Sequence, residues 1–258
     1  MKTFLIISFL SLNVLFSQSL PELKLNDETS SRSYSELKQL KKRQTVTKYA
    51  GIGYSLVFFM DENLRDAYPL LDTRSGNFLT NINLFFGISV AKALTVEFEP
   101  SLMFVSSSRL ITFTLRKPVN INGTDYTYSN TGNLNMVAIP IAINLRFFPF
   151  FKNSKSFSRL FFLGTGGGAI WIREEYDNYY STAPGLFFNS PVRIESTSQW
   201  APIIRAAIGF TGTGGAFGFG GEVRFNYVPL KQTDEPFATR FGKAFNSIDL
   251  CIRAYFGL

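Results

Sequence analysis

Apolar and polar residues alternate with a period of two along most of the chain after residue 48. In the first such segment, Ile52, Tyr54 and Leu56 share one face, and Gly53 and Ser55 lie on the other. Successive side chains of a β-strand point to opposite faces, so this alternation predicts strands with one apolar face each. The predicted strands are 49–60, 77–90, 94–106, 134–148, 159–174, 199–211, 216–228 and 247–258. Glycines make the alternation of the fifth predicted strand, 159–174, irregular.

The predicted connections between these strands alternate in length. They are 61–76, 91–93, 107–133, 149–158, 175–198, 212–215 and 229–245, in the order long, short, long, short, long, short, long. One end of an antiparallel sheet therefore has short turns and the other has long loops, which is typical of outer-membrane barrels. A sheet in hydrocarbon must also close on itself, because its backbone groups find no water to bond.

These patterns predict an all-β fold. We expect an eight-stranded antiparallel up-and-down transmembrane β-barrel over 49–258, in which the first and last strands pair. Each strand supplies at least the roughly 9–11 residues that a tilted transmembrane strand needs.

The amino terminus has the features of a secretory signal peptide. A basic start precedes an apolar stretch over 4–16 and the small residues of a cleavage site over 17–19. The apolar stretch is shorter than the roughly 20 residues of a membrane-spanning helix, which argues against an uncleaved anchor. We predict a signal peptide over 1–19 and a periplasmic segment, partly helical or disordered, over 20–48.

Composition restricts the possible chemistry. The chain has 258 residues, among them 28 Phe, one Cys and no His. The lone Cys251 excludes an internal disulfide, and without His or clustered Cys the common zinc and iron–sulfur sites are excluded, so we expect no metal and no cofactor. The formal charge of +7 is scattered, and its densest basic run, 41–43, lies outside the strands. We therefore expect no nucleic-acid partner.

The polar faces of the predicted strands carry charges of both signs. In a barrel with an apolar exterior these charges point into the lumen. They are Glu97, Glu99, Glu222 and Asp249, together with Arg146, Arg205, Arg224 and Arg253. The interior of an eight-stranded barrel is about wide enough for its side chains to fill, and unpaired buried charges are costly there. We predict an ion-pair network that plugs the lumen, with a small-solute pore as the alternative.

Enzymatic interpretations fit the sequence less well. The glycine-rich segments 164–168 and 212–221 lack the Lys-Ser/Thr pair and the helix of a phosphate-binding loop. Barrel enzymes of this membrane use a histidine for acid–base chemistry, and the chain has none. Glu97 and Glu99 are better explained as partners of the lumen arginines. We expect no catalytic residue and no enzymatic activity.

Several segments carry a resemblance to a known family. They are the strand–turn meander, VAIPIAINLRFF from Val137, FLGTGGG from Phe162 and the end LCIRAYFGL. On these, 49–258 resembles the porin-like outer-membrane β-barrel family, related in architecture to OmpA-type and OmpX-type small barrels. The resemblance implies that Phe256 and Leu258 form the signal read by the barrel-assembly machinery, although such signals usually end in an aromatic residue. Together with the cleavage region, it also implies a likeness to Bacteroidetes proteins, of which one relative assists a dedicated secretion system.

We expect a monomeric, non-enzymatic protein of a Gram-negative outer membrane that contributes to envelope integrity or surface contacts. The loops 107–133 and 175–198, rich in Tyr, Asn and Ser, are the candidates for such contacts. The alternative is an accessory subunit of an outer-membrane secretion or transport complex, with 20–48 as its periplasmic handle. The expected partners are outer-membrane lipid, the barrel-assembly machinery during biogenesis, and an envelope or secretion-complex protein.

Overall fold

The computed structural model describes residues 48–72, 79–150, 160–187, 190–214 and 217–257. The predicted signal peptide and nearly all of the predicted periplasmic segment lie outside these residues. The elements are β1 Lys48–Phe59, α3 Glu62–Ala67, β2 Thr80–Ala91, β3 Leu94–Ser107, β4 Ile111–Ile121, β5 Thr124–Phe147, β6 Phe161–Ser181, β7 Val192–Gly214, β8 Phe217–Tyr227, α4 Ala238–Phe241 and β9 Ser247–Gly257.

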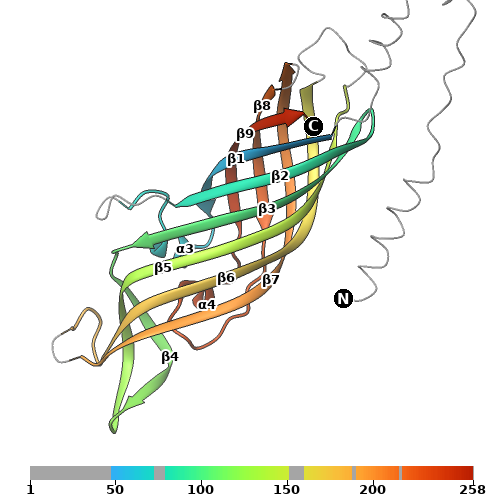
Figure 1. Cartoon of the computed structure of the whole chain (residues 1–258). Helices are drawn as coiled ribbons and strands as arrows, with labels where there is room; N and C mark the ends of the chain where they lie inside the picture. Colours follow the sequence, from blue (N-terminus) through green and yellow to red (C-terminus); the bar gives the residue numbers. More distant parts are fainter. Residues whose placement is uncertain (1–47, 73–78, 151–159, 188–189, 215–216, 258) are drawn as a thin grey trace, which may run out of the picture.

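Eight strands close into an antiparallel barrel, which confirms the predicted fold (Figure 1). Each of them pairs with the neighbours that precede and follow it in the wall, and β3 pairs directly with β5. At the seam, β1 pairs with β9 from Tyr49 opposite Gly257 to Phe59 opposite Ser247. The remaining strand, β4, pairs only with β5 and lies outside the barrel wall.

The wall is apolar outside and polar inside, as the alternation predicts. On β8, Phe219 and Val223 are 64% and 45% exposed, whereas Glu222 and Arg224 are 5% and 2% exposed. A closed sheet with this exterior satisfies its own backbone groups and presents hydrocarbon-like side chains to its surroundings. Among the described residues, no helix is long and apolar enough to cross a membrane.

Two predicted loops are wrong in part, because strands continue through them. The predicted loop 107–133 contains β4 and the start of β5, joined by a tight turn at Asn122 and Gly123, whose φ angles are 52° and 82°. Asn-Gly is a favoured pair for such hairpin turns, since both positions require positive φ. The predicted loop 175–198 is reduced to 182–191 by the extension of β6 and β7.

The extra strand length forms a second structure at the long-loop end of the barrel. We call it the extended sheet and define it as β4 with residues 124–135 of β5, 174–181 of β6 and 192–199 of β7. Figure 1 shows β4 and the ends of these strands beyond the level of both helices. The molecule is therefore a barrel whose wall continues on one side as an open sheet.

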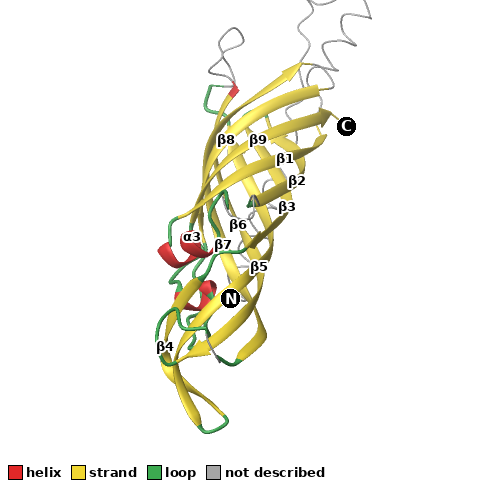
Figure 2. Cartoon of the chain, turned by 90° about the vertical axis from the view of Figure 1, so that its left-hand side faces the viewer, coloured by secondary structure: helices red, strands yellow, loops and turns green. Residues whose placement is uncertain are grey.

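Two short helices lie at the long-loop end, within the segments predicted as the loops 61–76 and 229–245. Figure 2 shows α3 and α4 close to one another where the barrel wall ends. The side chain of Asp61 caps α3, since its Oδ1 accepts hydrogen bonds from Asn63 N at 3.0 Å and Leu64 N at 3.4 Å. These helices position the side chains that close this end of the lumen.

Candidate functional site

Charged side chains from five strands meet inside the lumen. We call them the ion cluster. They are Glu97 and Glu99 on β3, Arg146 on β5, Arg205 on β7, Glu222 and Arg224 on β8, and Arg253 on β9. None is more than 5% exposed. The structure therefore brings together seven of the eight charged residues that the sequence places in the lumen.

One half of the ion cluster is built around Glu99. Its Oε1 accepts from Arg224 Nη1 at 2.7 Å and from Arg205 Nη1 at 3.1 Å. Asn144 Nδ2 donates to the other carboxylate oxygen at 3.1 Å. Arg224 also binds Glu222 on its own strand. Charge-assisted bonds of this kind are stronger than neutral ones, so they hold β3, β7 and β8 together across the lumen.

The other half of the ion cluster joins β3, β5, β8 and β9. Glu97 Oε1 lies 2.7 Å from Arg253 Nη2 and 3.2 Å from Arg146 Nη2. Glu222 Oε2 accepts from Arg146 Nη2 at 2.6 Å and from Arg253 Nη1 at 3.2 Å. Each of these arginines therefore bridges two carboxylates that come from different strands.

The eighth predicted residue, Asp249, is buried but stands apart from these contacts. Its carboxylate accepts from Asn226 Nδ2 at 2.8 Å and from Ser247 Oγ at 2.7 Å. Within the described chain it forms no ion pair. Its neighbours on β8 and β9 supply the hydrogen bonds instead, so the alternation predicts its direction correctly but not its partners.

Aromatic rings that the sequence analysis did not single out line the lumen toward the short-turn end. Tyr49 OH donates to Glu97 Oε2 at 3.0 Å. The guanidinium carbon of Arg253 lies 3.7 Å from the ring centroid of Phe85, a cation–π contact, and Phe85 packs edge to face on Tyr255. Their inward direction follows from the alternation, but nothing in the alternation distinguishes these rings from the aromatic residues expected on the outer face.

The ion cluster leaves little free space beside it. The cavity lined by Asn144, Arg146, Arg205 and Glu222 measures about 10 Å³, room for about one water molecule. The eight predicted lumen charges, all buried, balance as four carboxylates and four guanidiniums. The lumen charges therefore balance one another, and the cavity beside them is too small for more than about one water molecule.

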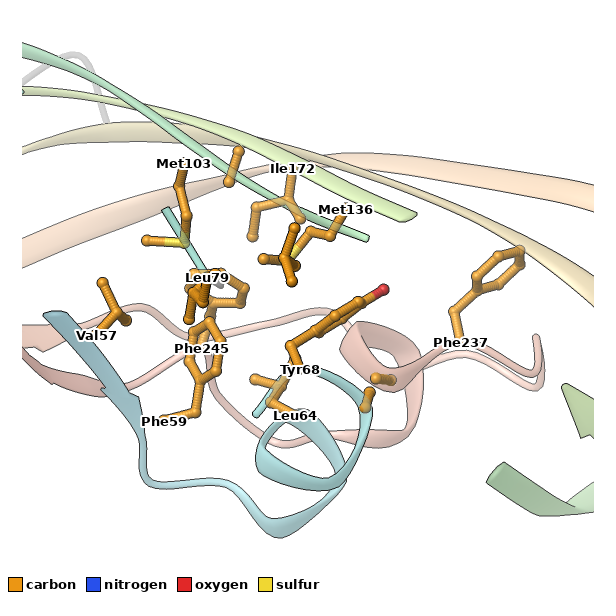
Figure 3. Close-up of a cluster of buried hydrophobic side chains, with 14 of the residues drawn as sticks. Val57, Phe59, Leu64, Tyr68, Leu79, Met103, Met136, Ile172, Phe237 and Phe245 are labelled. Carbon is orange, nitrogen blue, oxygen red and sulfur yellow. The ribbon is translucent and has the colours of Figure 1, made fainter. Parts of the chain in front are cut away.

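A second cluster of buried side chains, nearer the long-loop end, is apolar. We call it the lumen cap (Figure 3). It combines inward residues of the wall with residues from α3, α4 and their flanking segments. Its main members are Val57, Phe59, Leu64, Tyr68, Leu79, Met103, Met136, Ile172, Phe237 and Phe245, all buried. Burial of this apolar surface is the main force that holds the two loop segments inside the barrel mouth.

A buried carboxylate fastens the lumen cap to the wall. Glu174, on β6, accepts from Tyr68 OH at 2.9 Å, Tyr176 OH at 2.8 Å and Thr239 N at 3.1 Å. Thr239 lies in α4, whose N-cap residue Phe237 provides no side-chain hydrogen bond. Glu174 thus supplies from the wall the acceptor that α4 lacks, and it also binds the residue that ends α3.

The predicted barrel-assembly signal lies only partly within the described chain. Phe256 faces outward on β9, and its ring packs edge to face on Phe217, with centroids 4.5 Å apart. Leu258 lies outside the described residues. A role for these residues in assembly stays a prediction.

Comparisons with known proteins find no matching family model and no matching curated protein. Solved structures similar to this chain include Ail, the attachment invasion locus protein of Yersinia pestis (12% identity, TM-score 0.39, covering 82% of this chain and 96% of that one). Others are Neisserial surface protein A (8%, 0.39, 83% and 97%) and a major outer membrane protein from Thermus thermophilus (8%, 0.39, 83% and 100%). By its own strand pairing and apolar exterior, the chain is an eight-stranded transmembrane β-barrel of the outer-membrane type.

Proposed function

We propose that this protein is a non-conducting barrel of the bacterial outer membrane that acts through surface contacts rather than through transport. The observation that carries the proposal is the double closure of the lumen. The ion cluster and the lumen cap block the same path with different chemistry, one by paired charges and the other by packed apolar side chains.

A pore requires a continuous polar path, and neither closure provides one. Three arginines of the ion cluster, Arg146, Arg224 and Arg253, each contact at least two carboxylates, so moving any one of these three breaks several charge-assisted bonds. The lumen cap is anchored by Glu174 and by hydrophobic burial. Opening the lumen would therefore require two unrelated rearrangements.

The extended sheet supports the surface role. In outer-membrane barrels the short turns face the periplasm and the long loops face the exterior, which supports an extracellular position for this sheet. Its β7 strand carries Val192 and Ile194 two residues apart, with exposures of 55% and 77%. We infer that these two exposed apolar side chains contribute to a contact with another protein.

The closure is tested by recording from the purified barrel in planar lipid bilayers. We expect no discrete conductance steps for the wild-type protein over the usual voltage range. Reproducible steps that scale with salt concentration would contradict the proposal and favour the small-solute pore.

The orientation is tested by labelling single engineered cysteines, because the only native one, Cys251, is buried. Ile194→Cys should react on intact cells with a membrane-impermeant maleimide. Lys92→Cys, in the exposed turn between β2 and β3, is the matched control and should react only after the outer membrane is broken. The reverse pattern would place the extended sheet in the periplasm and remove the surface role.

A further inference from the structure

The first residues of β7 form an open edge of the extended sheet. Residues 192–203 of this strand pair with β6 but not with β8, whose pairing with β7 begins at Ile204 opposite Tyr227. The segment that contains α4 covers residues 197–199, where Arg240 Nη2 donates to Ser198 O at 3.1 Å. The stretch before it, 192–196, lies at the margin of the sheet (Figure 1), and we call it the β7 edge.

Every second residue of the β7 edge directs its backbone groups away from β6. Tyr180 N donates to Pro191 O at 2.9 Å, so these residues form a hydrogen-bonded pair of the ladder. Such pairs alternate with non-hydrogen-bonded pairs, so the outward N–H and C=O groups are those of Val192, Ile194 and Ser196. Ser198 continues this series, and Arg240 binds its carbonyl, which agrees with the assignment. The β7 edge thus offers backbone donors and acceptors to another strand.

The two margins of the extended sheet differ in how they are protected. Charged side chains, proline and irregular pairing are the usual protections against edge-to-edge association of strands. At the opposite margin, β4 carries Lys117 and Pro118, and its ladder with β5 is interrupted between Thr114 and Val119. The β7 edge contains no proline, and its pairing with β6 has no register shift. It is therefore the margin that is open to a partner strand.

The sequence of the β7 edge is complementary to itself. When two copies pair antiparallel about Ile194, that residue faces its own copy, and Arg193 faces Glu195 of the second copy. Each outward backbone residue then meets an outward backbone residue, with two hydrogen bonds for each such pair. Moving the centre of the pairing by one residue would set Arg193 against Arg193 or Glu195 against Glu195. Like charges directly opposite are destabilising, so the charges select one register.

Both charged side chains are available for this contact. Within the described chain Arg193 forms no ion pair, and it is exposed. The carboxylate of Glu195 accepts hydrogen bonds from Asn178 Nδ2 and Tyr180 OH through Oε2, which leaves Oε1 for the arginine of a second copy.

We propose that the β7 edge joins this protein to a second copy of itself on a facing membrane. Two antiparallel edges are related by a two-fold axis perpendicular to the sheet, so each copy contributes the same residues. The extended sheet continues the barrel wall, so this axis places the two barrels on opposite sides of the joint. Copies on facing cells meet in this geometry, whereas copies in one membrane do not. The contact is short, so its strength between cells comes from many pairs acting together.

This inference rests on the proposed surface role and names its partner. The test is disulfide formation between two cell populations that carry the protein with different epitope tags. In the proposed pairing the Cα atoms of Ile194 and its copy are about 5.5 Å apart, which a disulfide spans. Ile194→Cys should therefore give a disulfide that joins the two tags when the populations are mixed under a mild oxidant. The native Cys251 is buried and does not interfere.

Val192→Cys, on the same face of the same strand, is the matched control. In the proposed register Val192 faces Ser196 and lies about 13 Å along the strand from its own copy, too far for a disulfide. A second comparison tests the charges. Arg193→Glu, combined with Ile194→Cys, sets two acids against each other and should lower the mixed-tag disulfide several-fold, whereas Arg193→Lys should preserve it.

Equal mixed-tag disulfide from Val192→Cys and Ile194→Cys would reflect chance collision and overturn the inference. No disulfide from Ile194→Cys would overturn it too. Disulfide between copies of one tag only would place the pair in a single membrane, against the proposed geometry. An Ile194→Cys protein that does not react with an impermeant maleimide on intact cells would contradict the surface role itself, a separate outcome.

Discussion

At the scale of single residues, Glu99 is the most heavily used acceptor in the lumen. It binds Arg205, Arg224 and Asn144. In Glu99→Ala, Arg205 loses its ion-pair partner and stays buried, so we expect a destabilisation of about 3–5 kcal/mol. Urea unfolding of the barrel in lipid vesicles measures it.

The matched control for this variant is Glu175→Ala on β6. Glu175 lies 3.4 Å from Arg173, and both side chains are about half exposed, at 46% and 52%. Surface pairs of this kind contribute about 0–1 kcal/mol. Similar decreases in the free energy of unfolding for Glu99→Ala and Glu175→Ala would show that the buried contacts of Glu99 do not stabilise the barrel.

Glu174 lies beyond the apolar band, since its neighbour Arg173 points outward and is exposed. Burial raises the pKa of the Glu174 carboxyl above its ordinary value, and hydrogen bonds from Thr239, Tyr176 and Tyr68 only partly oppose this. The folded state thus favours the protonated form more than the unfolded chain does. Its stabilising contribution is full below the unfolded pKa, about 4.3, and is lost as the pH rises through the raised folded pKa.

We therefore expect Glu174→Gln to flatten the pH dependence of stability above the ordinary carboxyl range. Wild-type protein should lose stability relative to this variant as the pH rises. The free energy of unfolding at a series of pH values checks this, with Glu175→Gln as the exposed control on the same strand. A difference between wild type and Glu174→Gln that is constant with pH would exclude the carboxyl as the cause.

The direction of each lumen charge could be predicted from the sequence, because strand parity alone decides which side of the wall a residue faces. The contacts that each charged side chain makes could not be predicted in this way. Asp249 shares the parity of Arg253, yet it binds Asn226 and Ser247. The role of Glu174 could not be predicted from the sequence pattern, since it depends on loop segments that fold back into the barrel. Contacts across the lumen depend on barrel closure, which local periodicity does not contain.

At the scale of elements, the extended sheet escaped prediction because polar residues interrupt the alternation of its strands, among them Ser129 and Asn130 of β5, which are buried. A strand in lipid needs one continuous apolar face, whereas a strand outside the membrane does not. The polar stretch of β5 near Ser129 and Asn130 therefore resembled a loop.

The alternation in β6 was hard to interpret because this strand is rich in glycine. A Cβ at Gly168 would lie 1.9 Å from Ile141 O, so close strand approach requires glycine there, and glycine carries no hydrophobic phase.

The hairpin of β4 and β5 depends on its turn. Gly123 has a φ of 82°, which a β-branched residue adopts only with strain. We expect Gly123→Val to destabilise this hairpin by about 1–2 kcal/mol while leaving the barrel intact. External protease should then cleave within β4 on whole cells, and the heat-dependent gel shift should not change.

Thr114→Val, a substitution at an exposed β4 position with ordinary extended backbone, is the control. Cleavage that rises equally in both variants would mean that the turn geometry does not limit hairpin stability. The ion pair of Lys117 with Asp234, 2.9 Å long, also joins β4 to the segment between β8 and β9. As a surface pair it contributes little, so the turn should dominate.

At the scale of the whole molecule, the two closures of the lumen lie in series. We expect removal of either one to leave the barrel non-conducting. Tyr68→Ala with Phe245→Ala weakens the lumen cap, and Glu222→Ala with Arg224→Ala opens the ion cluster without changing net charge. Only the fourfold variant should pass small ions in planar bilayers. Conductance in either double variant would show that one closure alone seals the lumen.

The seam between β1 and β9 also completes the ion cluster. Arg253, which neutralises Glu97 and Glu222, belongs to β9, and β9 follows the other barrel strands along the chain. Until it docks, those two acids lack one of their counterions. The pairing that completes the ring is therefore also the pairing that completes the charge compensation of Glu97 and Glu222.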